Sequence, residues 1–417
     1  MLSWRAKIAS IVFAVCALTL ALDWVNEHLN PRVVSLTEKE RCPLCFGTSA
    51  CPAIENNEVV LEYPDFHSIF NNLFGVKNVY YGNFRNRKVV IKKLAHQSEW
   101  IDFNKQVCAD PTLSQFCSTN SKESSKVPID FNKMVMKELS NPDMTDLRQK
   151  MRLCPTVSNV NKLLRNVKTS HLRSKETQMH EHFAHVWSAL MINPEFLMVQ
   201  ILNADNHWPT PKFYGACGRL IIEENAGDPL LNFIKESWIK RAKIASSLLD
   251  AAYKFTFKDP NFAFYLTDIA TDNIAINEKL EAIFVDLENI IIVDKTPPTD
   301  VLNRLSDWNT TYANLIGIDS DCPDCFVFSP DDICTHRISD HNYYAVCQHI
   351  LSQGLNAEIN SQGFLYDPPD YILKKYPSIQ SLLQQCSVPS ATMSRVNGGI
   401  KLKQILDQII KDTSNIF

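Results

Sequence analysis

Residues 264–276 place polar side chains inside a segment that otherwise has the composition of a buried strand. The segment reads FYLTDIATDNIAI, and its apolar run is interrupted by Thr267, Asp268, Asp272 and Asn273. Carboxylates on an apolar background are costly unless they are paired or bind a cation. Because Asp286 stands alone in a second apolar run, IFVDLEN, the sequence predicts a short hairpin that gathers oxygen ligands at one end.

Magnesium with nucleotide phosphates suits such a site, because Mg²⁺ prefers hard oxygen ligands and few protein carboxylates. A single Asp-x4-Asn spacing is weak by itself, since Asp and Asn are frequent in turns and caps. The interpretation therefore depends on further motifs in the right order along the chain.

The length and composition indicate a globular protein. The chain has 417 residues, of which 45% are hydrophobic and 21% charged, and this is enough for a large core divided into two lobes. Its net charge of −4 comes without a sustained basic run. We therefore expect no nucleic-acid partner.

The N-terminus predicts entry into the secretory pathway. Arg5 and Lys7 precede an uncharged apolar run, residues 8–22, which Asp23 ends. This pattern is typical of a signal peptide or signal-anchor, assigned to residues 1–24. The run is short for a bilayer crossing, so we expect contact with a membrane only through an N-terminal anchor, if the segment is retained.

The cysteines agree with an oxidising compartment. Of the 13, Cys16 lies in the apolar run, and the even number that remains predicts a disulfide framework of unassigned connectivity. A less favoured alternative gathers the two C-x-x-C pairs, Cys42/Cys45 and Cys322/Cys325, on one zinc ion. Asn309-Thr310-Thr311 is a glycosylation sequon, which fits a lumenal loop.

Periodicity predicts a two-lobed α+β protein. We expect a hairpin over 76–94, a helix over 179–192, short strands over 195–202 and 218–225, an amphipathic helix over 238–255, and a hairpin that joins 264–276 to 281–293.

Several motifs in this order resemble those of protein kinases. The Asp268-x4-Asn273 spacing is similar to the catalytic loop, Asp286 falls where the metal-binding Asp of D-F-G would lie, and VVIK ends in Lys92. The segment 218–234 is similar to the strand, hinge and helix around adenine. Further stretches, CPLCFGTSAC, VKNVYYG, YGACGRL and DHNYYAVCQ, resemble the FAM69/DIPK group of divergent secretory-pathway kinases.

This resemblance implies a role for each candidate residue. Asp268 would orient the acceptor hydroxyl, while Asn273 and Asp286 would hold Mg or Mn. Lys92 would contact the ATP phosphates, with Glu181 as a candidate acidic partner. The adenine would lie against the backbone of a hinge formed by Glu223, Glu224 and Asn225.

The resemblance also implies a two-lobed protein-kinase-like fold with a disulfide-bearing N-terminal segment and insertions. We expect that segment over residues 25–72, an N-lobe over 73–225 with an insertion at about 104–178, and a C-lobe over 226–417. The implied location is the Golgi, the outside of the cell, or both. The implied partners are a nucleotide and an unidentified lumenal or cell-surface protein, with paracrine signalling.

Departures from the kinase pattern keep two functions open. Thr267 replaces the Arg of H-R-D, DLE replaces D-F-G, no A-P-E segment is evident, and the phosphate loop would keep only Gly75 and Gly82. The chain is therefore expected to be either an active secretory-pathway kinase or a pseudokinase that acts as a ligand or scaffold.

Overall fold

The computed structural model describes residues 32–62, 78–117, 129–140, 151–170, 175–314, 326–352, 363–390 and 392–414. The predicted signal segment, Gly75, Cys322 and Cys325 lie outside these residues. No helix within the described ranges has both the length and the apolar character needed to cross a bilayer.

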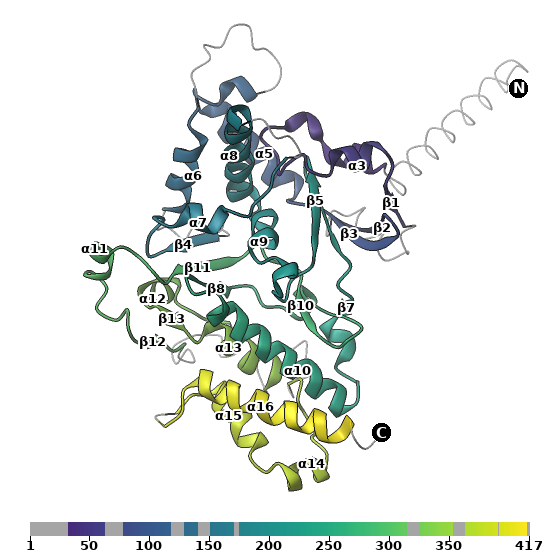
Figure 1. Ribbon diagram of the computed structural model, residues 1–417, viewed down its shortest axis with the longest axis vertical. Helices are drawn as coiled ribbons and strands as arrows, with labels where there is room; N and C mark the ends of the chain where they lie inside the picture. Colours follow the sequence, from purple (N-terminus) through teal and green to yellow (C-terminus); the bar gives the residue numbers. More distant parts are fainter. Residues whose placement is uncertain are drawn as a thin grey trace, which may run out of the picture. The chain divides into compact units, whose positions relative to one another are not determined.

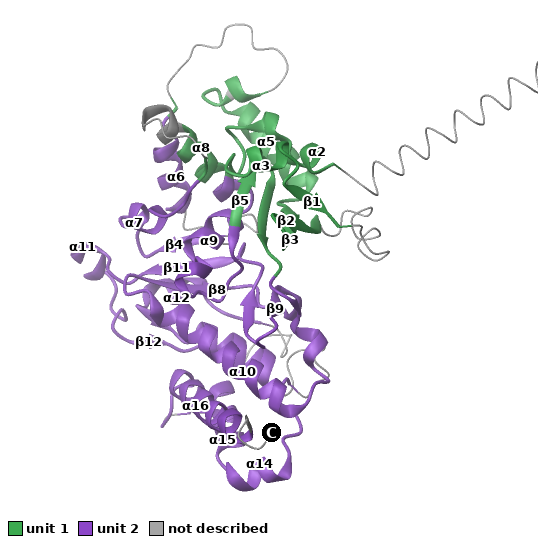
Figure 2. Cartoon of the chain, turned by 45° about the vertical axis from the view of Figure 1, so that its right-hand side comes forward, with its two compact units in different colours: residues 1–129, 169–188, 214–225 green, residues 130–168, 189–213, 226–417 purple. Residues whose placement is uncertain are grey.

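The chain divides into two compact units, coloured separately in Figure 2. Unit 1 comprises residues 1–129, 169–188 and 214–225, and unit 2 comprises 130–168, 189–213 and 226–417. The predicted insertion at about 104–178 therefore contributes to both units.

Unit 1 is built on a five-stranded sheet with the strand order β1-β2-β3-β6-β5. Strands β2 and β3 form the predicted hairpin, which turns at Arg85 and Asn86, both with positive φ. Such a two-residue turn matches the natural twist of paired strands. The strands of this sheet are β1 (Val59–Leu61), β2 (Val79–Phe84), β3 (Arg87–Lys93), β5 (Phe213–Cys217) and β6 (Leu220–Glu224).

The N-terminal cysteine-bearing segment packs onto one face of this sheet. Val89 and Ile91 of β3 and Ile222 of β6 share a buried cluster with Leu36 and Ile54 of the segment. Side chains alternate along a strand, so Lys92 faces away from this cluster. The helices of unit 1 are α2 (Val33–Thr37), η1 (Lys39–Arg41), α3 (Cys51–Glu55), α5 (Gln97–Ala109), η2 (Ser114–Phe116) and α8 (Lys175–Ile192), whose last turn belongs to unit 2.

Gly82 does not belong to a phosphate loop, which corrects the expectation from sequence. It lies inside β2 opposite Leu61 of β1. A Cβ atom at this position would lie 2.5 Å from the carbonyl oxygen of Val60. Glycine is needed here because the neighbouring strand approaches closely.

Unit 2 contains two three-stranded sheets, ordered β4-β11-β8 and β10-β9-β7. The residues of the predicted hairpin form two antiparallel pairs in different sheets: β9 pairs with β10, where Ile276 is opposite Ala282, and β8 pairs with β11. Every residue of β8 and β11 is buried. The strands are β4 (Met151–Cys154), β7 (Asp228–Pro229), β8 (Phe262–Leu266), β9 (Ile274–Ile276), β10 (Ala282–Phe284), β11 (Ile290–Asp294), and the separate pair β12 (Thr311–Tyr312) and β13 (Ile338–Ser339).

Unit 2 also contains most of the helices that the structure describes. Figure 1 shows α10 beside α16, and the Ser246 hydroxyl donates a hydrogen bond to Asp407 between these helices. The helices are α6 (Phe131–Leu139), α7 (Val160–Leu164), α9 (Glu195–Ile201), η3 (Ala204–Asn206), η4 (Leu230–Phe233), α10 (Trp238–Tyr253), the π-helix η5 (Lys254–Lys258), η6 (Thr271–Asn273), α11 (Thr299–Leu302), α12 (Pro330–Thr335), α13 (His341–Tyr344), the π-helix η7 (Ala345–Leu351), α14 (Asp370–Lys375), α15 (Ile379–Ser387) and α16 (Arg395–Ser414).

The strand predicted over 195–202 is wrong, because these residues form helix α9. A short apolar run cannot be assigned by period alone when both faces are buried. Pro194 at the N-cap starts the helix, and the Gln200 side chain donates a hydrogen bond to the carbonyl of Phe196.

The predicted disulfide framework is confirmed within the described residues, where five bonds form. The zinc alternative is wrong for Cys42 and Cys45, because these two residues are bonded to each other. The pairs are Cys42–Cys45, Cys51–Cys217, Cys108–Cys117, Cys154–Cys334 and Cys347–Cys386.

Candidate nucleotide-binding and metal-binding residues

Lys92 forms a buried ion pair with Glu223 in unit 1. The Lys92 Nζ lies 3.1 Å from a Glu223 carboxylate oxygen, and the two side chains are 13% and 1% exposed. Lys92 is opposite Ile221 in the β3–β6 ladder. Glu223, two residues further along β6, is therefore its diagonal neighbour on the same face, within reach of a long side chain.

Lys93 points to the opposite face of the sheet, as strand alternation predicts. Its Nζ lies 2.8 Å from Glu38, which also pairs with Arg219 at 2.7 Å. Burial alone would raise the pKa of Glu38, but Lys93, Arg41 and Arg219 together lower it to about 2. Lys93 thus contacts the N-terminal segment on one face of the sheet, and Lys92 lies on the opposite face with Glu223.

The other residues of the predicted hinge, Glu224 and Asn225, lie differently from Glu223, which pairs with Lys92. Glu224 is exposed and faces away from Glu223. The Asn225 amide donates a hydrogen bond of 3.3 Å to the carbonyl of Lys88, which extends the ladder by one residue. Glu181 is half-buried on α8, and the ion pairs found in the described part of the chain do not include it.

The β9–β10 hairpin brings Asn273 and Asp286 to the same end in unit 2. Asn273 directly precedes β9, and Asp286 follows the last residue of β10 by two positions. The Val285 amide donates a hydrogen bond of 3.0 Å to the carbonyl of Asn273, which holds the two chain segments together. Both side chains are half-buried.

Asp268 lies in the electrostatic field of this hairpin end. Partial desolvation raises the pKa of Asp268, and the charges of Asp286 and Asp272 raise it further. The Asn289 carboxamide, 3.4 Å from the Asp268 carboxylate, opposes this rise weakly. Unit 2 therefore gathers like charges at this point.

Buried polar side chains of α13 hold the strand that leads to Asp268. The His341 Nε2 donates a hydrogen bond of 2.8 Å to the carbonyl of Leu266, and the Asn342 carboxamide donates one of 2.8 Å to the carbonyl of Phe264. Burial lowers the pKa of His341 to about 4, which keeps the imidazole neutral.

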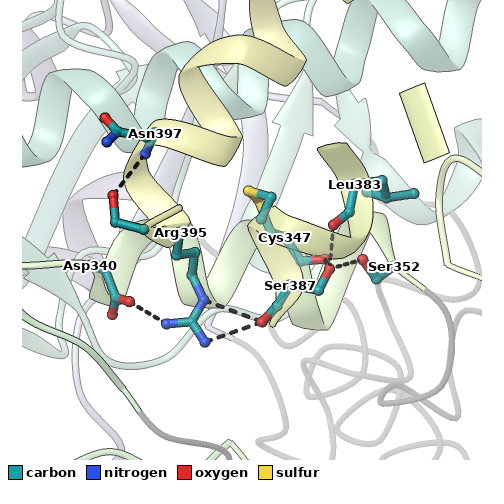
Figure 3. The surroundings of a disulfide bond; sticks show 9 residues. Asp340, Cys347, Ser352, Leu383, Ser387, Arg395 and Asn397 are labelled. Carbon is teal, nitrogen blue, oxygen red and sulfur yellow. Dashed lines mark hydrogen bonds and ion pairs between the residues drawn. A yellow bond between two sulfur atoms is a disulfide. The ribbon is translucent and has the colours of Figure 1, made fainter. Parts of the chain in front are cut away.

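The N-terminal end of α13 is fixed in turn by a buried arginine of α16. Arg395, which is fully buried, forms an ion pair with Asp340 and donates hydrogen bonds to the carbonyl of Ser387 (Figure 3). Hydrogen bonds and an ion pair, in addition to apolar packing, thus hold the strand that precedes Asp268.

The oxygen donors fit a magnesium-type ion better than a transition metal. One carboxylate and one carboxamide from the hairpin, Asp286 and Asn273, match the few hard ligands that Mg²⁺ takes from a protein. The described residues contain no group of three or more His, Cys, Asp or Glu side chains that could hold a metal ion. Asn273 and Asp286 would be the residues that hold such an ion.

Two features were missed by reasoning from sequence. Glu223 was assigned only a backbone role, although its position two residues beyond the partner of Lys92 could have indicated a side-chain contact. His341 and Asn342 belong to the DHNYYAVCQ stretch that supports the family resemblance, but the sequence indicates no role for them. Their partners in β8 are about 76 residues away in the chain, so no local pattern indicates the contact.

Comparison with known proteins gives consistent matches. Residues 186–389 match the family model described as the protein-kinase domain of FAM69. The human protein named divergent protein kinase domain 2A is 29% identical over 401 residues, which cover 94% of this chain and 91% of that protein. Its counterpart from Xenopus tropicalis is 29% identical over 92% of this chain and 89% of its own length. Divergent protein kinase domain 2B of mouse is 22% identical over 88% of this chain and 81% of its own.

Proposed function

This chain belongs to the divergent protein kinase family, and from that premise we propose that it binds ATP with Mg or Mn and transfers the γ-phosphoryl group to a hydroxyl of a lumenal or extracellular acceptor. The observation that carries the proposal is the end of the β9–β10 hairpin, where Asn273 and Asp286 gather next to Asp268. Like charges at one point are stabilised by a cation, and ATP is bound as a cation complex.

Each residue has one task in the proposed reaction. Lys92, held by Glu223, contacts the phosphates of the nucleotide. The acceptor hydroxyl oxygen attacks the γ-phosphorus, the bond to the ADP oxygen breaks, and the hydroxyl proton passes to the Asp268 carboxylate. A divalent ion held by Asn273 and Asp286 would neutralise charge on the phosphates.

The raised pKa of Asp268 supports its role as the proton acceptor. Partial desolvation raises the pKa of Asp268, with a further rise from neighbouring negative charge, and a carboxylate with a raised pKa is a stronger base than an isolated one. Asn289 faces this carboxylate and would keep it oriented toward the acceptor.

A pseudokinase that acts as a secreted or Golgi ligand or scaffold is the second candidate. The observation that favours it is the Asn225 amide, which already donates to the Lys88 carbonyl instead of being directed at a ligand. Thr267 and the DLE segment point the same way, because two residues that assist phosphoryl transfer in kinases are replaced.

Nucleotide binding and transfer are tested separately on the purified chain. Thermal shift with Mg-ATP or Mn-ATP measures binding, and incorporation of labelled γ-phosphate into lumenal and secreted proteins measures transfer. Saturation at 100 times the Kd is expected to stabilise the fold by about 2.7 kcal/mol. Asp286→Ala and Lys92→Met are expected to abolish the shift, whereas Asp300→Ala, which removes an exposed acid of α11, leaves it unchanged.

The outcomes distinguish the candidates. Binding with transfer supports the kinase, and binding without transfer supports the pseudokinase. A shift that survives Asp286→Ala contradicts the assigned metal ligands, and the absence of a shift in the wild type contradicts nucleotide binding.

The proposal also locates the chain in the secretory pathway, in the Golgi or outside the cell. Disulfides that link distant parts of the chain, such as Cys154–Cys334, persist in oxidising compartments, and this supports the location. Asn309 of the sequon is exposed. A glycosidase-sensitive mass shift that Asn309→Gln removes is expected, and a protein that remains unglycosylated and cytosolic would contradict the location.

A further inference from the structure

The Cys42–Cys45 disulfide closes a far shorter loop than the disulfides that connect distant segments. Its cysteines are 3 residues apart, whereas those of Cys51–Cys217 are 166 apart and those of Cys154–Cys334 are 180 apart. The stabilisation that a disulfide gives through the unfolded chain increases with the loop that it closes. Cys42–Cys45 therefore contributes little as a structural link.

Other contacts hold this loop in place. The Phe46 amide donates to the carbonyl of Gly218 at 2.9 Å, and the Gly218 amide donates back to Gly47 at 2.8 Å. Phe46 is fully buried and packs edge-on against Trp100, with 5.7 Å between ring centroids. Opening the disulfide would leave these contacts intact.

The two sulfur atoms have unequal surroundings. Cys42 is half-buried, whereas Cys45 is fully buried. The Nδ1 of His185 lies 3.0 Å from the carbonyl oxygen of Cys45 and 3.4 Å from its sulfur. A carbonyl oxygen only accepts hydrogen bonds, so Nδ1 carries a hydrogen at this position. Burial lowers the pKa of His185 to about 4, so the ring is neutral at pH 7.

We propose that Cys42–Cys45 is a redox-active disulfide, in which Cys42 exchanges with external thiols and His185 stabilises the thiolate of Cys45. Attack occurs at an accessible sulfur, and the buried sulfur leaves. The leaving thiolate forms beside the N–H of His185, and a hydrogen-bond donor at that position favours the charged sulfur. This proposal does not depend on nucleotide binding.

The exchange consumes two external thiols. The first, as a thiolate, bonds to the Cys42 sulfur, the S–S bond breaks, and Cys45 leaves as a thiolate. The second attacks the external sulfur of this mixed disulfide and releases Cys42 as a thiolate. The products are the protein dithiol and an external disulfide, so two electrons pass from the external thiols to the protein.

The test equilibrates the purified full chain in glutathione buffers of graded ratio of reduced to oxidised form. Acid quenching, alkylation and peptide mass mapping then report the state of each disulfide. Reduction of Cys42–Cys45 is expected at a ratio of reduced to oxidised glutathione at least about tenfold lower than the ratio that reduces Cys108–Cys117. The latter also closes a short loop in unit 1, with a separation of 9 residues, and it serves as the internal control.

Variants test the part played by His185. His185→Phe removes the N–H and is expected to slow reduction by glutathione about tenfold, while His185→Gln, which keeps an N–H donor, recovers part of the rate. His182→Gln is the matched control, because His182 lies on the same helix but contacts the hydroxyl of Thr169.

Two results would overturn the proposal. One is a wild-type protein in which Cys42–Cys45 opens together with or after Cys108–Cys117. The other is a folded His185→Phe protein, judged by circular dichroism, that is reduced at the wild-type rate. If His185→Phe does not fold, the wild-type comparison with Cys108–Cys117 decides by itself.

Discussion

The charged side chains on the sheet of unit 1 form an ion pair, whereas those at the hairpin of unit 2 have the same sign. In unit 1 the lysine has an acid beside it, and Glu223 is nearly inaccessible to solvent. In unit 2 partial desolvation raises the pKa of Asp268, and the charges of Asp286 and Asp272 raise it further. The first arrangement is largely neutralised within the protein, whereas the second leaves like charges close together.

Loss of the long-range disulfide of unit 1 is expected to have the largest effect. Cys51→Ser with Cys217→Ser removes the covalent link between the N-terminal segment and β5, which spans 166 residues. We expect the free energy of unfolding to fall by about 4 kcal/mol. Denaturant unfolding measures it, and the paired replacement of Cys42 and Cys45, which should cost much less, is the control. Equal losses in the two variants would contradict the assigned roles.

The second-largest loss of stability is expected from breaking the ion pair of unit 1. Lys92→Met leaves the Glu223 carboxylate buried beside an apolar side chain, and we expect a loss of about 3 kcal/mol. Adding Glu223→Leu should recover most of it, because the uncompensated charge is then gone. Denaturant unfolding of both single variants and the double variant measures the coupling. Additive effects would show that the two residues stabilise the fold independently.

His341 offers a pH-dependent test of unit 2. Its folded pKa, about 4, is below the ordinary value of 6.5, so its contribution to stability is present above pH 6.5 and is lost as the pH falls toward 4. Between pH 7 and pH 5 this loss is about 2 kcal/mol. His341→Gln should reduce the pH dependence of the unfolding free energy by that amount. An unchanged slope would mean that other groups dominate acid unfolding.

The smallest expected effect is a gain in stability at the like-charged site. Because the folded state raises the pKa of Asp268, its ionised form is disfavoured at pH 7, and Asp268→Asn should relieve this. We expect the Tm without divalent ions to rise by roughly 1–2 °C. Asp268→Glu, which keeps the charge, is the control. A fall in the Tm of the Asn variant would show that Asp268 is stabilised by its surroundings.

Sequence reasoning correctly assigned the elements whose signals are local. The β2–β3 and β9–β10 hairpins, the end of α8 at Ile192 and the extent of α10 follow from periodicity and turn residues. Alternation along β3 also predicts that Lys92 and Lys93 point to different faces of the sheet, and their ion pairs with Glu223 and Glu38 agree. Local geometry is enough for such features, because neighbouring residues decide them.

Reasoning from the sequence could not assign features that depend on distant partners. The helical state of α9 and the structural need for Gly82 depend on packing against other segments. Glu223 meets Lys92 across 131 positions of the chain, and pairing register alone brings them together. Strand register is fixed by a whole sheet, so no short motif records it.

The amino-acid sequence by itself determined the kinase-like order of motifs, the oxidisable cysteines and the apolar stretches that become strands. The tertiary structure alone decided which cysteines pair, which acid neutralises Lys92, and that His185 lies against the Cys42–Cys45 disulfide. The physical reason is that ion pairs, disulfides and pKa values depend on distances of a few ångströms. Those distances are set by the packing of segments that the chain separates widely.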